Sequence, residues 1–384
     1  MSDMMELTRR ASLSRLFTLL QTKGVHSGFR RPARVAFNYA ARSSLSDLDY
    51  FSAFDVLVTG GVLSPDQIRI VRQHGTHLVL YVWSSAFYPN EGIDVAGAWQ
   101  ADVGRNAGEW LLSANTVAGG AADSGKSAFW YDFGHAGFRQ AFADYLCALL
   151  RRHGYRGVFL DTLGWDALPA DLKEEFQQRH RGKNYDSEQA QLLALLRRRL
   201  GARGILFTNQ GYRKPDFFLR FSDFDLTENS FTYVTPLAET RFRPWHTTPN
   251  EWDSIEVPMT NLVMRASRSY PRVQFVHLNY ATGNAETLQR AVEYSFACGR
   301  LWNHSSFVAF PGIQKAIRSR IYFTRLGDPV TRTYQEDRGH GVAWRAFQNG
   351  LVAVNSSDQP YRIEKIGVML SDPPRGYVIA RFKQ

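Results

Sequence analysis

Eight short apolar segments alternate with amphipathic helical segments between residues 34 and 310 of this 384-residue chain. Each apolar segment is nearly continuous and ends in polar residues, which is typical of strands buried on both faces of a parallel sheet. Beyond residue 320 the pattern changes to alternation, which is typical of antiparallel hairpins. The sequence therefore predicts an α/β protein, a (β/α)8 TIM barrel with a small C-terminal antiparallel β domain.

The eight strands are predicted at residues 34–40, 54–61, 76–85, 156–164, 204–211, 222–230, 272–281 and 300–310. One helical segment begins at the Ser-Pro-Asp sequence of residues 64–66, which is a helix start signal. Four helical segments are expected to end at a glycine, as helices commonly do: Gly75, Gly154, Gly201 and Gly299.

Two connections, residues 86–135 and 231–271, are too long for simple crossovers, and loops of this length are usually functional. In "GVAWRAFQNGLVAVNSS" the apolar residues alternate on both sides of Asn349-Gly350, which predicts a hairpin. We therefore expect three parts. These are an N-terminal basic helix or arm over residues 1–30, the barrel over residues 31–318 and a β-sandwich-like domain over residues 319–384.

The net charge of +10 favours neutral or anionic partners. The basic residues are dispersed, and runs such as "LRRRL" lie at expected helix ends, so nucleic acid is not favoured as a partner. Two cysteines imply no disulfide framework, and the ten histidines show no metal-ligand spacing. We expect no cofactor, no metal and a monomer. Every apolar run is far shorter than a transmembrane helix requires, so no membrane span is expected.

The N-terminal segment "LTRRASLSRLFTLLQTKG" is similar in outline to a twin-arginine export signal. Against this interpretation, Arg15 interrupts the apolar stretch and no small-residue cleavage site follows. A basic amphipathic helix or arm is the favoured interpretation, and the compartment stays open between the cytoplasm and export.

Residues 120–127, "GAADSGKS", match the letters of the phosphate-binding loop of nucleotide hydrolases. Such a loop needs a buried strand before it and a helix after it, so that backbone N–H groups converge on the phosphates. Here the preceding "EWLLSANTV" has no clear strand pattern, and the following "AFWYDFG" is aromatic and extended rather than helical. We interpret the match as a flexible glycine loop and expect no nucleotide.

Two carboxylates stand at expected strand ends, where barrel enzymes place their reacting groups. Asp161 ends "GVFLD", and Glu228 lies in "FDLTENS" two strands later. A helix cap or a salt bridge would be the structural alternatives for these acids. Asp223 and Asp225 lie further back on the second strand, and one of them is expected to be a buried, hydrogen-bonded structural acid.

Aromatic and amide residues accompany this pair. Two carboxylates with such neighbours suit glycoside hydrolysis, in which one acid protonates the leaving oxygen and the other attacks the sugar or activates water. We expect Glu228, partly buried near Phe231 and Tyr233, to be the general acid and Asp161 the nucleophile or base. The expected substrate-binding residues are Asn38, Tyr39, Tyr81, Trp83, Tyr131, Asp132, Asn209, Asn229, Asn279, Tyr280 and Trp302.

The segment "HGYRGVFLDTLGW" resembles the fourth-strand motif of barrel glycoside hydrolases of the endo-α-1,4-polygalactosaminidase family and related glycosyl-hydrolase-like proteins. "FWYDFGHAGFRQAFADYL", "DLTENS" and "AFQNGLVAVNSSDQP" are also similar to segments of these proteins, so the resemblance covers roughly residues 34–384. It implies that Asp161 and Glu228 are the catalytic pair. Arg156 stands where the family motif usually has Asp. The charge of +10 disfavours a polycationic galactosamine polymer, so we expect a neutral or acidic glycan.

Two other functions stay open at this point. A non-catalytic carbohydrate-binding barrel would share the aromatic mouth, and a carboxyl separation well beyond about 9.5 Å would favour it. A nucleic-acid partner would show binding that weakens steeply with salt. Sugar identity, linkage, stereochemistry and endo or exo action are not determined by the sequence.

Overall fold

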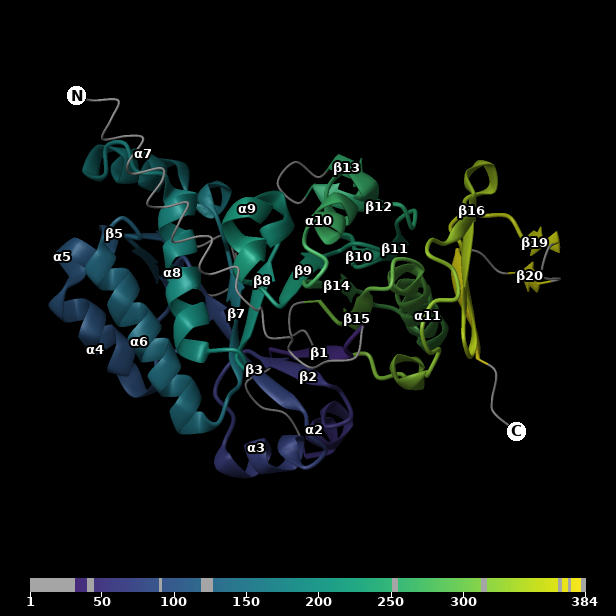
Figure 1. Cartoon of the computed structure of the whole chain (residues 1–384), viewed down its shortest axis with the longest axis horizontal. Coiled ribbons are helices and arrows are strands. Elements are labelled where there is room, and N and C mark those ends of the chain that lie inside the picture. Colours follow the sequence, from purple (N-terminus) through teal and green to yellow (C-terminus); the bar gives the residue numbers. More distant parts are fainter. Residues whose placement is uncertain are drawn as a thin grey trace.

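The computed structural model describes residues 32–39, 45–89, 92–118, 127–250, 255–311, 316–364, 368–371 and 374–380. The expected arm over residues 1–30 and residues 119–126 of the glycine loop lie outside these ranges. Eight parallel strands form one sheet in the order β1-β2-β3-β7-β8-β9-β14-β15, which confirms the predicted barrel (Figure 1). Their bounds are β1 (Val35–Asn38), β2 (Val56–Thr59), β3 (His77–Trp83), β7 (Gly157–Asp161), β8 (Ile205–Asn209), β9 (Phe224–Glu228), β14 (Gln274–Tyr280) and β15 (Ser305–Ala309).

The barrel is nearly rather than fully closed. Each strand pairs with the next in parallel register, but within the described residues no backbone ladder joins β15 to β1. Side chains join the two ends of the sheet instead. The backbone N–H of Ala33 donates to Gln274 Oε1 at 2.8 Å, and the Ser305 hydroxyl donates to the carbonyl of Ala33.

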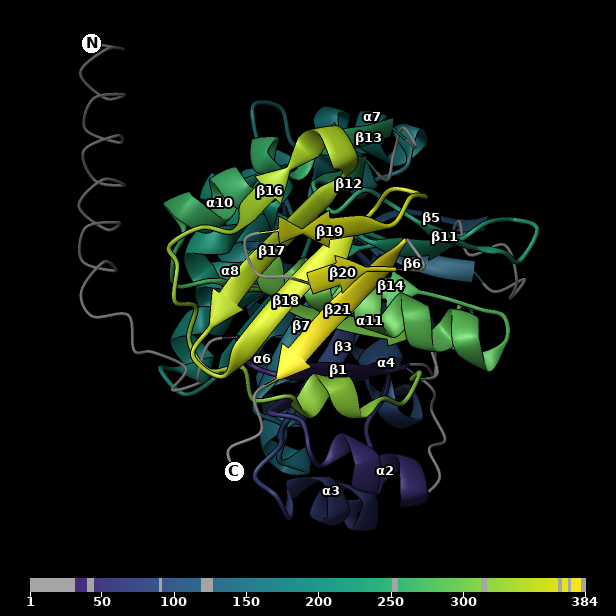
Figure 2. The ribbon, with the colours of Figure 1, turned by 90° about the vertical axis from the view of Figure 1, so that its right-hand side faces the viewer.

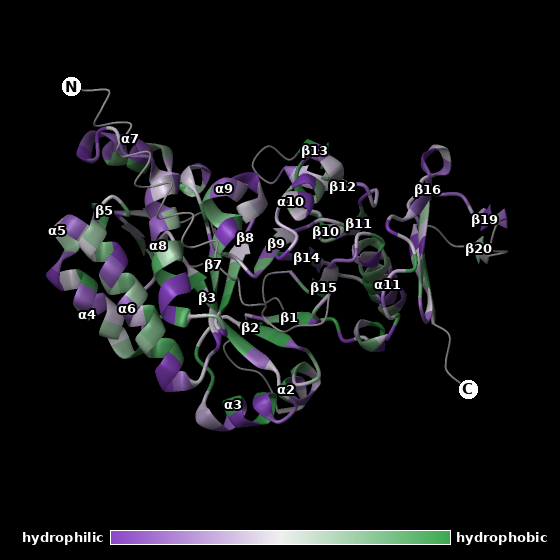
Figure 3. Cartoon of the chain, viewed as in Figure 1, coloured by the Kyte–Doolittle hydropathy of each residue, from purple (hydrophilic) through white to green (hydrophobic). Residues whose placement is uncertain are grey.

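Helices surround the strands with their apolar faces turned inward (Figure 3). They are α2 (Leu45–Phe51), α3 (Pro65–Arg72), α6 (Ala136–His153), α7 (Ala170–Arg179), α8 (Tyr185–Leu200), α9 (Pro215–Phe218), α10 (Val263–Ser269) and α11 (Ala285–Leu301). The predicted signals hold at α3, where Ser64 and Gln67 form a capping box, and at α6, which ends at Gly154 with a φ of 69°. None of the described helices is long and apolar enough to cross a membrane.

Helix α11 corrects one predicted boundary. It continues past Gly299 to Leu301, so β15 begins only at Ser305 and not at residue 300. A Cβ atom on Gly299 would lie 3.0 Å from the Cβ of Ser306. This glycine therefore serves the close packing of helix on strand, and it does not end the helix.

The first long connection carries a small sheet of its own. Strands β4 (Ala86–Phe87), β6 (Ser127–Tyr131) and β5 (Leu111–Ala118) pair antiparallel, next to α4 (Ala98–Arg105) and α5 (Ala107–Trp110). The segment before the phosphate-loop match is thus a strand, contrary to expectation. A second strand follows the match, as the extended pattern predicted, where a phosphate loop would need a helix.

The second long connection folds as two hairpins followed by α10. Strand β10 (Thr232–Val234) pairs with β11 (Thr240–Phe242), and β12 (Thr247–Asn250) pairs with β13 (Ile255–Pro258). Both hairpins follow β9, which ends at Glu228, so they lie at the end of the barrel where the carboxylates are expected.

The C-terminal residues form the expected antiparallel sheet, which lies in front of α11 in Figure 2. Its order is β16 (Gln335–Asp337), β17 (Val342–Phe347), β18 (Gly350–Asn355) and β21 (Arg375–Ala380), and β19 (Tyr361–Ile363) pairs with β20 (Val368–Leu370) beside it. Strand β21 lies close to α11, because a Cβ on Gly376 would clash with the Glu293 carbonyl oxygen. Arg375 pairs with Glu293 at 3.1 Å. Helix α11 therefore joins the barrel to the sheet.

Phenylalanine rings fill the interior of the barrel. The ring of Phe37 lies 6.0–6.1 Å from the rings of Phe159, Phe207 and Phe307, which come from three other strands. All four side chains are fully buried. Aromatic burial of this kind makes a large contribution to core stability.

Of the two acids that precede Glu228, Asp225 on β9 is the buried one, and Asp223, just before β9, forms an ion pair with Arg197 at 2.6 Å. The carboxylate of Asp225 accepts hydrogen bonds from Thr208 Oγ1 at 2.7 Å and from the backbone N–H groups of Gly211 at 2.8 Å and Tyr212 at 3.0 Å. Asp225 thus holds the turn after β8 against β9.

We predict that Phe37→Ala lowers the free energy of unfolding by about 3–5 kcal/mol, because it leaves a cavity among three packed rings. Urea denaturation measures this change. Leu237→Ala is the control, since that side chain is 82% exposed and its loss should change stability by at most about 0.5 kcal/mol. Equal effects of the two substitutions would contradict the assignment of Phe37 to the core.

The stability of the fold should also depend on pH through Asp225. Burial raises the pKa of this carboxyl from its usual 3.8 to about 7, although its three donors act in the opposite direction. Between these values the native state holds a proton that the unfolded chain releases, so the contribution of Asp225 to stability falls as the pH rises. The free energy of unfolding of the wild type, relative to Asp225→Asn, should fall by up to about 4 kcal/mol from pH 4 to pH 7. A difference that does not change with pH would refute this.

Candidate active site

Asp161 and Glu228 are brought to the same end of the barrel. Asp161 is the last residue of β7 and Glu228 the last of β9, and both side chains are half-buried. Strand β8 lies between β7 and β9 and ends at Asn209. Because neighbouring parallel strands end at a common rim, these three side chains lie together.

The alternation of side chains along each strand points Asp161, Asn209 and Glu228 in the same direction. Asp161 lies two residues after Phe159 and Asn209 two residues after Phe207, and both rings are in the barrel interior. Side chains two positions apart share a face of a strand, so the acids and the amide continue the interior row into the mouth.

The amide of Asn209 connects the two carboxylates. Its Nδ2 donates to Asp161 Oδ1 at 2.8 Å and to Glu228 Oε1 at 3.2 Å. Because the same nitrogen donates to both carboxylates, the distance between Asp161 Oδ1 and Glu228 Oε1 cannot exceed the sum of the two hydrogen-bond lengths. The pair is therefore far closer than the separation of about 9.5 Å beyond which a two-carboxylate reaction would be ruled out.

Asp161 accepts two further hydrogen bonds. The hydroxyl of Tyr81 donates to Oδ2 at 2.6 Å, and the backbone N–H of Thr162 donates to Oδ1 at 2.7 Å. Thr162 has a φ of 56°, a left-handed conformation that is uncommon for a β-branched residue. Three donors thus face this carboxylate and fix its orientation at the mouth of the barrel.

Tyrosine hydroxyls surround the pair. Tyr280 donates to Glu228 Oε2 at 3.5 Å, and the ring of Tyr39 lies 5.0 Å from that of Tyr81. Burial and then the charge of Glu228 are the largest causes that raise the pKa of Tyr39 well above its usual range. Burial and the charge of Asp161 do the same for the pKa of Tyr81. Both hydroxyls therefore stay protonated at neutral pH, and that of Tyr81 donates to Asp161.

Three further predicted residues lie at strand ends of this rim. Trp83 pairs with Asp161 in the β3–β7 register, and its ring lies 4.9 Å from that of Tyr88 and 5.4 Å from that of Trp130. Asn38 ends β1 and is buried, but it lies between Phe37 and Tyr39 and so points to the other face of the strand. Asn229 follows Glu228 in a left-handed conformation with a φ of 53°.

The structure does not bring Tyr131 and Asp132 to this pair. Tyr131 is fully buried, its ring lies 4.8 Å from that of Phe138 on α6, and its hydroxyl accepts a hydrogen bond from the Trp99 ring nitrogen. Asp132 pairs with His180 at 2.7 Å. Both residues hold the β4–β6–β5 sheet and its neighbours together.

Asn279 and Trp302 also lie away from the mouth. Asn279 is one residue before Tyr280 and so points to the other face of β14, where its Oδ1 accepts from the backbone N–H groups of Phe231 and Thr232. The placement of Trp302 is a correction. It caps α11 ahead of β15, at the opposite end of the barrel, and its ring packs on Tyr334 at 4.6 Å.

Sequence reasoning missed the residues that hold Asp161 and Thr162 in place. The hydroxyls of Ser84 and Ser85 donate to the carbonyls of Asp161 and Thr162. Gln189 on α8 is fully buried, donates to both serine hydroxyls at 3.4 Å and accepts from the backbone N–H of Gly164 at 2.6 Å. The serines at the end of β3 could have been found as polar strand-end residues. Gln189 lies within a helix and carries no such signal.

Among the described residues, no group of three or more His, Cys, Asp or Glu side chains is arranged to hold a metal ion. The mouth is instead composed of two carboxylates, one amide and three tyrosine hydroxyls. Such an arrangement can transfer protons and stabilise a developing positive charge on a substrate.

Comparisons with known proteins agree with this geometry at the level of the fold. No family model and no curated protein matches the chain. The solved glycoside hydrolase domain of PelA from Pseudomonas aeruginosa is similar over 74% of this chain and 97% of that chain, with 21% identity and a TM-score of 0.50. A glutamate-to-alanine variant of that domain gives the same coverage and TM-score at 20% identity. At such identities the likeness shows the fold alone, and the chain therefore has a TIM-barrel fold like that of glycoside hydrolases.

Proposed function

We propose that this protein is a glycoside hydrolase that cleaves a polysaccharide, with Glu228 as general acid and Asp161 as nucleophile. The single observation that carries the proposal is the bridge made by Asn209, whose one nitrogen donates to both carboxylates at the mouth of the barrel. The TIM-barrel fold shared with a solved glycoside hydrolase domain supports the same reaction class.

The hydrogen bonds support this division of roles. Asp161 accepts three bonds of 2.6–2.8 Å, which suit a charged nucleophile. Glu228 accepts bonds of 3.2 Å and 3.5 Å from Asn209 and Tyr280. We assign the proton that the leaving oxygen needs to Glu228, because Asp161 is the carboxylate that three short hydrogen bonds hold in place.

The short separation favours a double displacement. Inverting enzymes keep their carboxyl groups about 6.5–9.5 Å apart to admit a water molecule, whereas retaining enzymes keep them about 5–5.5 Å apart. The two hydrogen bonds from Asn209 are 2.8 Å and 3.2 Å long. Even if they were collinear, the two accepting oxygens would be closer together than the range of inverting enzymes. In the first step Asp161 would bond to the anomeric carbon while Glu228 protonates the leaving oxygen. In the second step Glu228 would take a proton from water, whose oxygen then displaces Asp161.

The neighbours of the pair suit a sugar. Tyr39, Tyr81, Trp83 and Tyr280 provide aromatic surfaces for C–H groups, and Asn209 and Asn229 provide amides for hydroxyls. The net charge of +10 favours a neutral or acidic glycan over a polycationic one. The carboxyl separation that would have favoured a non-catalytic binding barrel is not observed, so hydrolysis is the function that we propose.

We predict that Asp161→Asn and Glu228→Gln each lower kcat/KM by about three orders of magnitude or more, because each removes a charge or a proton used in the transition state. Reducing-sugar release from a panel of neutral and acidic glycans measures the effect. Glu239→Gln makes the same chemical change on the hairpin after β9, where the side chain is 54% exposed, and should keep full activity. Near-full activity in both Asp161→Asn and Glu228→Gln would end the proposal.

The reaction should proceed with retention of the anomeric configuration. Proton NMR of the first product, recorded before mutarotation, distinguishes the two outcomes. We expect the initial product to have the configuration of the substrate, because carboxylates that share one amide nitrogen leave too little space for a water molecule between Asp161 and the sugar. An inverted first product would show that Asp161 acts as a base and not as a nucleophile.

A further inference from the structure

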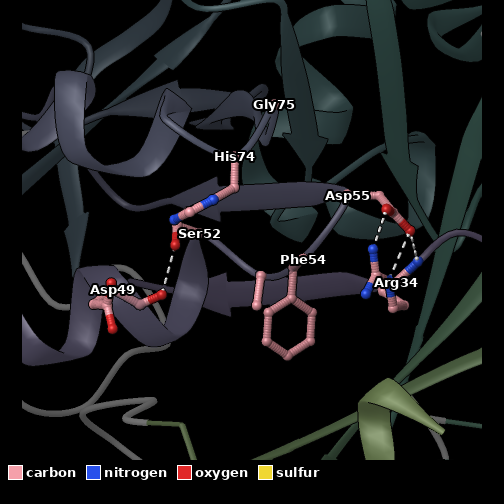
Figure 4. A pocket seen from close by; sticks show the side chains of 8 residues that line it. Arg34, Asp49, Ser52, Phe54, Asp55, His74 and Gly75 are labelled. Atoms are coloured by element: carbon pink, nitrogen blue, oxygen red, sulfur yellow. Dashed lines mark hydrogen bonds and ion pairs between the residues drawn. The ribbon is translucent and has the colours of Figure 1, made fainter.

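A large cavity lies at the end of the barrel opposite to the carboxylates. Its volume is about 920 Å³, and it is lined by the first residues of β1, β3 and β15, by α11, by residues 322–328 and by the turn at residues 348–349. A smaller hollow of about 430 Å³ adjoins it and shares Arg34, Phe54, Asp55 and Gly75 (Figure 4). The cavity therefore lies where α11, the barrel and the C-terminal sheet meet.

Arg300, in the last turn of α11, lines this cavity with an unsatisfied charge. The residue is only 8% exposed. Its contacts are a long hydrogen bond of 3.5 Å from Nη2 to the Gly327 carbonyl and the face of Phe347, 4.7 Å from the guanidinium carbon. Its Nε is buried without a hydrogen-bond partner, and no carboxylate of the described residues pairs with it. A guanidinium has five N–H donors, so most of its capacity is unused.

The other charged groups around the cavity do not neutralise Arg300. Asp55 is held by Arg34 at 2.6 Å, as Figure 4 shows, and Asp328 is exposed. Burial and Arg156 lower the pKa of His77 to about 4, and burial and Arg345 lower that of His304 to about 3, so both histidines are neutral. Burial and Arg345 lower the pKa of Arg300 to about 10, although the charge of the exposed Asp328 acts in the opposite direction, and Arg300 stays charged at neutral pH.

Arg345 provides an instructive comparison, because it is another buried arginine near Phe347. Its guanidinium donates to the carbonyls of Leu301, Thr331 and Arg332 at 2.8–3.0 Å. The Nε of Arg345 is buried without a partner, as that of Arg300 is, but its terminal nitrogens have three acceptors where those of Arg300 have one at 3.5 Å. Buried polar groups in proteins nearly always have partners, and an unpaired buried charge is costly. The contrast indicates that an acceptor from outside the chain belongs beside Arg300.

We propose that this cavity binds a small organic anion whose phosphate or carboxylate group is recognised by Arg300. The planar fork of a guanidinium matches the two oxygens of either group. Phe296, Tyr322 and Phe323 line the same cavity and would pack against the body of the ligand, and Ser306 and Thr324 offer hydroxyl donors. The site is separate from the carboxylate pair and does not depend on the proposed hydrolysis.

Binding is tested by thermal unfolding and calorimetric titration of the full chain with glucose 6-phosphate, glucuronate and glucose, at constant ionic strength. We expect a saturable rise in Tm with at least one of the two anions, of roughly 3 °C or more at a hundredfold excess over Kd. Glucose should produce none. A response to only one anion identifies the group that is recognised. No saturable response to either anion, or an equal response to glucose, would overturn the proposal.

The role of Arg300 is tested by Arg300→Gln and Arg300→Lys. We expect Arg300→Gln to weaken anion binding by about tenfold or more, since a charge-assisted pair of hydrogen bonds is lost, and Arg300→Lys to have an intermediate effect. Arg152→Gln removes the same charge from the exposed last turn of α6, on another side of the barrel, and should leave the affinity unchanged (Figure 1).

An arginine that served only to stabilise α11 would behave differently. Both Arg300 variants would then lower Tm, and the wild type would show no response to either anion. If Arg300→Gln does not fold, Arg300→Lys and the wild-type titration still decide the question. Unchanged anion affinity in a folded Arg300 variant would refute the assignment of Arg300 as the anion-binding residue.

Discussion

The carboxamide of Asn209 is the contact on which the mouth of the barrel depends. If both carboxyl groups were ionised, two unit charges about 6 Å apart would repel each other by about 3 kcal/mol at an effective dielectric constant of about 20. The amide lies between the two carboxylates and donates to both, and these hydrogen bonds offset the repulsion. The amide can do so because β8 lies between the two strands that carry the acids, and because Asn209 is level with Asp161 while Glu228 lies two residues beyond Leu226, the register partner of Asn209.

The support for this contact extends into the surrounding fold. Asp161 is held by Tyr81 on one side and by the backbone of Thr162 on the other, and the buried network of Ser84, Ser85 and Gln189 holds the carbonyls of the same turn. On β9 the fully buried Asp225 holds the turn that follows Asn209. Polar side chains that face the helices thus hold the rim in place. The two carboxylates and Asn209 lie on the opposite face of their strands, in line with the apolar side chains of the barrel interior.

The two ends of the barrel differ in charge and in composition. The carboxyl end carries two acids among tyrosines. The opposite end carries a buried arginine above a cavity that the C-terminal sheet helps to enclose. Helix α11 is the common element, because it packs on β15 through Gly299, contacts β21 at Gly376 and carries Arg300 in its last turn. The sheet therefore completes a surface that the barrel alone would not have.

The fold class followed from the sequence because each barrel strand is a continuous apolar run, and all eight lie where the pattern predicts. The acids, Asn209, Tyr39, Tyr81 and Tyr280 were also within reach, since strand ends of a parallel barrel share one rim. Trp302 was misplaced because it lies ahead of β15, and the start of a barrel strand is at the end opposite to the mouth. Asn279 could not be told from Tyr280 without knowing which face of β14 points inward. The sequence by itself thus determined the barrel and most of its rim, through periodicity and strand order. Only the tertiary structure decided the bridge of Asn209, the support from Gln189 and the unpaired charge of Arg300, because these depend on contacts between residues far apart in the chain.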